Sequence, residues 1–204
     1  MISTVEIEQR RTSDQLKTFV KDVRKRIESC PGELRRAQNG EGRYREFINE
    51  VWPLSQFAHL LYPPGTLFLP VLGNQGYDVE VFDEEGEPLD KIEIAKPHDG
   101  QANAENNRLL NERRVGHIRV CDFGGQLDAL KPWIASTAEN KSLKDYSDCT
   151  LVLVALTDPP FDEELPILEQ RCIEFVQRLK QMAYRAKRAF LAVPSLDKCF
   201  EIQG

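Results

Sequence analysis

Two alternating segments joined by an acidic turn constrain the fold of this chain most. Residues 77–82 (YDVEVF) and 91–95 (KIEIA) place polar and apolar side chains in turn, as half-buried strands do. Residues 83–88 (DEEGEP) have the composition of a turn, so the whole stretch predicts a β-hairpin. Because side chains alternate between the two faces of a strand, we expect Asp78 and Glu93 to be neighbours on one face.

Helical and strand patterns lie on both sides of this hairpin. Before it, apolar residues at helical spacing predict helices over residues 13–29 and 44–61, the second interrupted by Pro53. Residues 66–72 predict a strand that lies at a sheet edge or contains a bulge, because Pro70 has no N–H to donate. After the hairpin, the patterns predict helices over residues 102–114 and 162–185, strands over 117–121, 149–156, 189–193 and 199–202, and a mixture of helix and loops over 126–148.

This order of elements predicts an α/β (α+β) fold with a mixed central β-sheet flanked by helices. The 204 residues are enough for one large domain. We expect an N-terminal helical segment, residues 1–42, packed on an α/β domain formed by residues 43–204.

Composition predicts a cytoplasmic protein that does not enter membranes. No apolar run approaches the roughly 18 residues that a membrane span needs, and the first residues lack a signal sequence. The five cysteines are an odd number with no CxxC spacing, which favours free thiols over disulfides or a zinc site. The net charge of −6 argues against a protein that coats nucleic acid, although residues 24–26 (RKR) leave room for a local basic strip that binds DNA or RNA.

The expected Asp78/Glu93 pair is the strongest chemical candidate in the sequence. Two carboxylates held together repel, raise each other's pKa or bind a divalent cation. A pair of this kind is a common way to hold Mg²⁺ beside a phosphate. The GxSxG, HExxH, P-loop and GxGxxG motifs are all absent from the sequence.

The run 76–81 (GYDVEV), the acidic turn and 92–95 (IEIA) together resemble the PD-(D/E)XK nuclease superfamily, which has the restriction-endonuclease-like fold. The resemblance covers residues 43–202 and rests more on the order of elements than on the letters. It implies a hydrolase that cleaves phosphodiesters, with Mg²⁺ or Mn²⁺ held by Asp78 and Glu93. Glu50 of the preceding helix would be a third carboxylate, with Glu46 as its alternative.

The chain departs from that family at one position. The residue two after the family's Glu is usually Lys, and here it is Ala95. Such a lysine would position the attacking water and stabilise charge on the phosphate in the transition state. Lys96 and His98 are the candidates to replace it as catalytic groups, although strand alternation directs Lys96 to the opposite face unless a bulge turns it back.

The resemblance also assigns nucleic-acid contacts to Asn107 and Arg108, in the helix expected after the hairpin. Three functions stay open at this point. The chain could be a divergent metal-dependent nuclease, or it could keep the fold without catalysis as a binding or scaffolding module. The third function is an unrelated protein-interaction domain, in which residues 13–29 dock a partner or form a homodimer.

Overall fold

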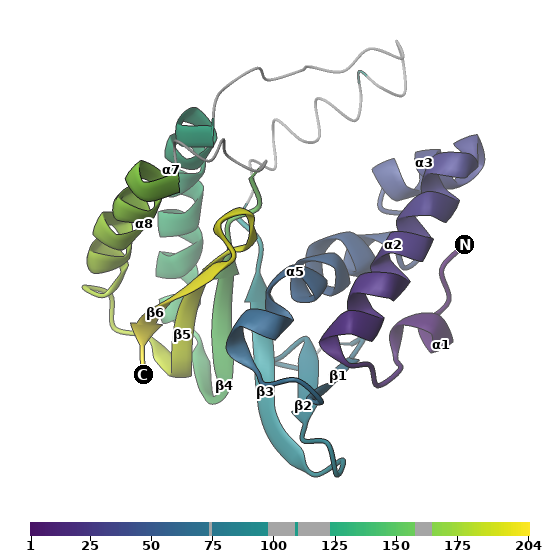
Figure 1. The fold of residues 1–204 in the computed structure, drawn as a ribbon, viewed down its shortest axis with the longest axis horizontal. Coiled ribbons are helices and arrows are strands. Elements are labelled where there is room, and N and C mark those ends of the chain that lie inside the picture. Colours follow the sequence, from purple (N-terminus) through teal and green to yellow (C-terminus); the bar gives the residue numbers. More distant parts are fainter. Residues whose placement is uncertain (74, 98–108, 110–122, 158–164) are drawn as a thin grey trace.

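Six strands form one mixed β-sheet in a computed structural model that describes residues 1–73, 75–97, 109, 123–157 and 165–204 (Figure 1). The strands, in their order across the sheet, are β1 (Leu67–Pro70), β2 (Val79–Phe82), β3 (Pro88–Ala95), β4 (Asp145–Val154), β5 (Arg185–Val193) and β6 (Lys198–Gln203). β1, β2 and β3 are antiparallel, β3, β4 and β5 are parallel, and β6 is antiparallel to β5. The mixed sheet predicted from the sequence is therefore confirmed.

The helices lie on opposite sides of this sheet (Figure 1). One side carries α1 (Thr4–Ile7), α2 (Ser13–Ser29), α3 (Pro31–Gln38), α4 (Tyr44–Glu46), the π-helix η1 (Phe47–Val51) and α5 (Trp52–Leu61). The other side carries α7 (Phe123–Ser142) and α8 (Leu165–Leu179). No helix in the described residues is long and apolar enough to cross a membrane.

The central strand β4 separates two hydrophobic cores. Val152 and Val154 pack with the core of the N-terminal helices, whereas Leu151 and Leu153 pack with the core beneath α7 and α8. A strand buried on both faces has a nearly continuous apolar sequence rather than an alternating one. The run that predicted this strand, CTLVLVAL over residues 149–156, therefore follows from its position between two helical layers.

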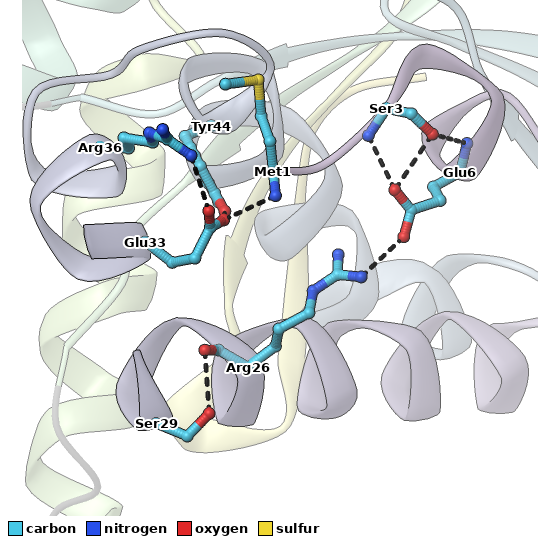
Figure 2. Close-up of polar contacts among 8 residues, drawn as sticks. All are labelled: Met1, Ser3, Glu6, Arg26, Ser29, Glu33, Arg36 and Tyr44. Atoms are coloured by element: carbon cyan, nitrogen blue, oxygen red, sulfur yellow. Dashed lines mark hydrogen bonds and ion pairs between the residues drawn. The ribbon is translucent and has the colours of Figure 1, made fainter. Parts of the chain in front are cut away.

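Polar contacts join the short N-terminal helices to one another (Figure 2). The Glu6 carboxylate of α1 accepts a hydrogen bond from Arg26 of α2 at 2.9 Å. Glu33 of α3 accepts from the Tyr44 hydroxyl, from Arg36 and from the amino group of Met1. The hydrogen bond from Tyr44, followed by that from the amino group, lowers the pKa of Glu33 to about 2.

The predicted helix over residues 44–61 is divided by a π-helix. The interruption was expected near Trp52, and η1 ends at Val51, so that Pro53 lies in the first turn of α5. Proline is tolerated there because the first N–H groups of a helix have no partner within the helix. Each π-helical turn holds more than the 3.6 residues of an α-helix, so η1 changes the direction in which its side chains point.

Two predicted boundaries in the second half of the chain were wrong. The helix expected within residues 126–148 is present as α7, which continues to Ser142, but β4 begins at Asp145 instead of at the predicted residue 149. Pro132 interrupts the helical pattern in the sequence, although Leu127, Ile134 and Ala138 are buried at helical spacing. α8 ends at Leu179, several residues before the predicted end at 185, and β5 begins at Arg185. The predicted helix 102–114 and strand 117–121 lie outside the described residues, except for position 109.

Candidate active site

The hairpin of β2 and β3 places Asp78 beside Glu93. Val79 pairs with Ile92 in the antiparallel ladder, so Asp78 is one step further along, level with Glu93. The Asp78 N–H donates to the Ile92 carbonyl at 2.8 Å, and the Asp78 carboxylate accepts from the Ile94 N–H at 2.7 Å. The backbone of β3 therefore fixes the position of the Asp78 carboxylate.

Burial and a neighbouring negative charge govern the protonation of Asp78. Glu93 is only 9% exposed, and Asp78 is half-buried. Burial raises the pKa of Asp78 to about 6, the negative charge of Glu93 adds to this effect, and the hydrogen bond from Ile94 opposes it. Two carboxylates whose negative charges repel in a partly buried site are better stabilised when a cation lies near them.

A lysine from a distant part of the chain supplies one such cation. Lys141, in the last turn of α7, forms an ion pair with Glu93. Tyr146 joins the pair, because its hydroxyl is 3.3 Å from both the Glu93 carboxylate and the Lys141 ammonium. Burial lowers the pKa of Lys141, but the hydrogen bond and charge of Glu93 outweigh it, so this pKa is above its ordinary value.

Glu50 lies on the π-helix and interacts electrostatically with the same pair. Burial raises the pKa of Glu50 to about 8, and the charges of Asp78, Glu46 and Glu93 raise it further. Glu50 therefore keeps its proton at neutral pH. Glu46 accepts from Arg43 at 3.3 Å through one oxygen, while its other oxygen is buried without a hydrogen-bond partner among the described residues.

The position of the family's lysine is enclosed by the protein core. Ala95 is 4% exposed and packs in the core beneath α7. Lys96 donates to the carbonyl of Ile48 in η1 at 3.4 Å, and burial lowers the pKa of its ammonium group. Strand alternation thus directs Lys96 towards the π-helix and Glu93 towards α7, as expected when no bulge intervenes. The remaining predicted site residues, His98, Asn107 and Arg108, lie outside the described residues.

Lys141 and Tyr146 were not found by sequence reasoning. Lys141 is separated from Glu93 by 48 positions and lies in the region that was predicted only as a mixture of helix and loops. The residues around Lys141 contain no pattern that indicates a contact with Glu93. The signal that could have found it is chemical: a buried strand glutamate needs a cationic partner, and such a partner has to come from a neighbouring element.

The donor set suits a hard divalent cation. Mg²⁺ is usually held by one or two carboxylates together with water and phosphate oxygens, and Asp78 and Glu93 supply two such carboxylates. Among the described residues, no group of three or more His, Cys, Asp or Glu side chains is arranged to hold a metal ion. Glu50 is near enough to be influenced by Asp78 and Glu93, but the three carboxylates do not form such a group.

Comparisons with known proteins found no matching family model, no matching curated protein and no matching solved structure. The function of the site is therefore argued from its own residues.

Proposed function

We propose that this chain is a divergent, metal-dependent nuclease-like hydrolase of the PD-(D/E)XK type, which cleaves phosphodiester bonds in nucleic acid. The observation that carries the proposal is the contact between Lys141 and Glu93, next to Asp78. An acidic pair with an ammonium group beside it is the set of groups that this chemistry needs, and Ala95 alone would have left the lysine missing.

The order of the elements supports the same proposal. A helical segment with Glu50 comes first, then β1, then β2 with Asp78 directly before it, then β3 with Glu93 near its end. The chain then crosses over through α7 to β4, which is parallel to β3. This order of helices and strands agrees with the one that the resemblance implies. Lys141 of α7 supplies the positive charge that the family's lysine would supply from the strand.

Each residue has a role that follows from its environment. Asp78 and Glu93 would hold Mg²⁺ or Mn²⁺, and such an ion polarises phosphoryl oxygens and makes a bound water more acidic. Lys141 keeps a positive charge at Glu93, where it would stabilise negative charge that develops on the phosphate. Glu50, which holds a proton at neutral pH, would donate that proton or a hydrogen bond to the leaving oxygen. Lys96 and His98 remain weaker candidates for these tasks.

The test is a cleavage assay on single- and double-stranded DNA and RNA with Mg²⁺ or Mn²⁺. Asp78→Asn, Glu93→Gln and Lys141→Met should each lower the rate by about 10²-fold or more, and Lys141→Arg should retain part of it. Asp128→Asn is the matched control, because that carboxylate is exposed, pairs with Lys131 and lies more than three helical turns before Lys141 in α7. Absence of cleavage, or equal cleavage by wild type and the three variants, would contradict the proposal.

Calorimetric titration with Mg²⁺ gives a readout that does not depend on turnover. Saturable binding by wild type that is lost in Glu93→Gln supports a metal site at the acidic pair. The second candidate function, a binding module without catalysis, is favoured by the internal pairing of Glu93 with Lys141 and by the burial of Ala95. That function predicts neither Mg²⁺ binding nor cleavage.

The third function, an unrelated interaction domain, would use the helix α2. Its apolar side chains Leu16, Val20 and Val23 are buried in the core of the N-terminal helices. A partner or a second copy of the chain would therefore meet the charged face of α2. Light scattering of the full chain at low and high salt tests for self-association through this face, because salt screens contacts between exposed charges.

A further inference from the structure

A basic groove lies between α2 and α5. It has a volume of about 370 Å³ and is lined by Lys17, Val20, Lys21, Arg24, Lys25 and Glu28 of α2 and by Gln56 of α5. We refer to it as the α2 groove. Its lining holds four cationic side chains and one carboxylate, although the whole chain has a net charge of −6. The groove is thus a local site of positive charge on an acidic protein.

The lysines of the α2 groove have no ion-pair partner among the residues that the structure describes. Lys17, Lys21 and Lys25 follow one another at intervals of four residues, so their ammonium groups lie on one side of the helix and repel one another. Within the described part of the chain, none of the three forms an ion pair. An anion bound along this row would relieve the repulsion and stabilise the folded chain.

Arg24 is held in place at the same groove. Its guanidinium group lies over the ring of Trp52, 4.6 Å from the ring centroid, and is 3.6 Å from the Glu28 carboxylate. A guanidinium group fixed by stacking loses little conformational freedom when it binds a phosphate. The groove therefore combines one cation held by its contacts with a row of three lysines that form no ion pair within the described part of the chain.

We propose that the α2 groove binds the phosphate backbone of a single nucleic-acid strand. Proteins that bind single strands without sequence preference use a positively charged groove that follows the backbone. At about 1.5 Å per residue, the row from Lys17 to Lys25 extends over about 12 Å, which is long enough to contact several phosphates. The cations line a recess between two helices, and a recess admits one strand more readily than a duplex.

The lining of the groove favours nucleic acid over an acidic protein segment. Val20 is its one apolar lining residue, and only 4% of Val20 is exposed. Peptides that dock in helical grooves are held by apolar side chains in pockets, whereas a phosphate backbone needs only cations and hydrogen-bond donors. The proposal rests on the proposed function for the identity of the polymer, and Gln56 connects the groove to the helical segment that carries Glu50.

The test is fluorescence anisotropy with a labelled single strand about 15 nucleotides long, in buffer with EDTA so that metal-dependent cleavage does not occur. We expect Lys21→Gln/Lys25→Gln to weaken binding by about tenfold or more at low salt. The slope of log affinity against log salt should become shallower by about 1.4, or about 0.7 for each lost phosphate contact. Arg178→Gln/Lys180→Gln makes the same change in net charge at two exposed positions, one in the last turn of α8 and one directly after it, on the other side of the sheet, and should leave binding unchanged.

Several results would overturn the proposal. Unchanged binding in the groove variant, or an equal loss of affinity in both double variants, would show that the groove lysines do not hold the strand. Tighter binding of the matching duplex than of the single strand would contradict the preference for one strand. Displacement of the strand by polyglutamate as readily as by unlabelled DNA would show that any polyanion is bound. Glu93→Gln separates this proposal from the proposed function. Strand binding that persists in Glu93→Gln, in a protein that cleaves nothing, supports the α2 groove while the nuclease proposal fails. Cleavage with normal binding in the groove variant supports the nuclease while the groove proposal fails.

Discussion

The side chain of Lys141 extends from the last turn of α7 to the carboxylate of Glu93 on β3, on the side of the sheet where Ala95 is buried two residues later. The two charged side chains are 19% and 12% exposed, respectively. The chain thus places an ammonium group beside its acidic pair from a helix instead of from the strand itself. The consequences for stability can be measured independently of activity.

Loss of Lys141 should destabilise the fold. Lys141→Met leaves the Glu93 carboxylate buried without its cation, and we expect a loss of about 2–4 kcal/mol in the free energy of unfolding. Urea denaturation measures it. Lys141→Met/Glu93→Gln should recover most of the loss, because no charge is left unpaired. Lys131→Met, which breaks the more exposed pair with Asp128, should cost about 1 kcal/mol or less, and an equal cost for the two lysines would show that burial of the pair is unimportant.

A lysine at the position of Ala95 should compete with Lys141. Ala95→Lys places a long charged side chain in a filled core next to an existing ammonium group, and should cost about 3 kcal/mol of unfolding free energy. In the Lys141→Met background the same substitution should cost less, since the new ammonium group can pair with Glu93. A double-mutant cycle measured by urea denaturation gives the coupling. If the losses of unfolding free energy in the two single variants add up to the loss in the double variant, the lysines at positions 95 and 141 do not pair with the same carboxylate.

The proton held by Glu50 should make stability depend on pH. Between about pH 4.5 and 8 the folded chain keeps a proton that the unfolded chain releases, so the free energy of unfolding falls as the pH rises. The same effect from Asp78 ends near pH 6, which leaves Glu50 as the cause between pH 6 and 8. With allowance for the partial exposure of Glu50, Glu50→Gln should stabilise the metal-free protein by about 1–2 kcal/mol at pH 8 and hardly at all near pH 4.

Denaturation in EDTA across this pH range measures the Glu50 effect. Glu41 is exposed, so Glu41→Gln is the control, and its free energy of unfolding should equal that of the wild type at every pH. If the free energy of unfolding of Glu50→Gln changes with pH in the same way as that of the wild type between pH 6 and 8, Glu50 does not hold a proton in the folded protein.

Replacing Asp90, the other carboxylate of β3, should destabilise the fold. Its side chain is 3% exposed and accepts hydrogen bonds from Tyr62, Thr150 and Lys187. Burial raises its pKa, but the hydrogen bonds outweigh this effect and hold the pKa below its ordinary value, so its stabilising contribution is present at neutral pH and is lost in acid.

Asp90→Asn should therefore cost about 2–3 kcal/mol of unfolding free energy at neutral pH, because the amide replaces a charge that three donors surround. Thermal or urea denaturation checks this. Asp145→Asn, in an exposed pair with Arg185, should change stability by about 1 kcal/mol at most. A result near zero for Asp90→Asn would mean that this network contributes little to the fold.

The parts of the fold that depend on local pattern could be predicted from the sequence. The boundaries of α2 agree with its capping box at Thr12 and Gln15, and the alternation of residues 77–82 and 91–95 gave the hairpin that aligns Asp78 with Glu93. Pro70 correctly placed β1 at the edge of the sheet. In each case the signal lies within a few residues of the feature that it predicts.

The parts that depend on packing between distant elements could not be predicted. The contact between Lys141 and Glu93 requires α7 to end beside β3, and nothing near either residue encodes that distance. The high pKa of Glu50 requires both burial and the closeness of Asp78 and Glu93, which only the folded sheet provides. Composition suggested a basic strip, but the recess between α2 and α5 follows from how the two helices pack.

The π-helix η1 makes the side chains before it and the side chains after it point in directions that a continuous α-helix would not combine. Because its turn is wider, the residues before Val51 and those after it are rotated relative to a continuous α-helix. Glu50 is thereby directed towards the sheet, while Trp52 and Gln56 contact or line the surface of α2. Deleting one residue within η1 would restore an ordinary helix and turn its two ends by about 100° relative to each other. The positions of Glu50 and of the α2 groove are thus coordinated by a single extra residue, whose removal would rotate Glu50 relative to the groove without changing the lining of the groove.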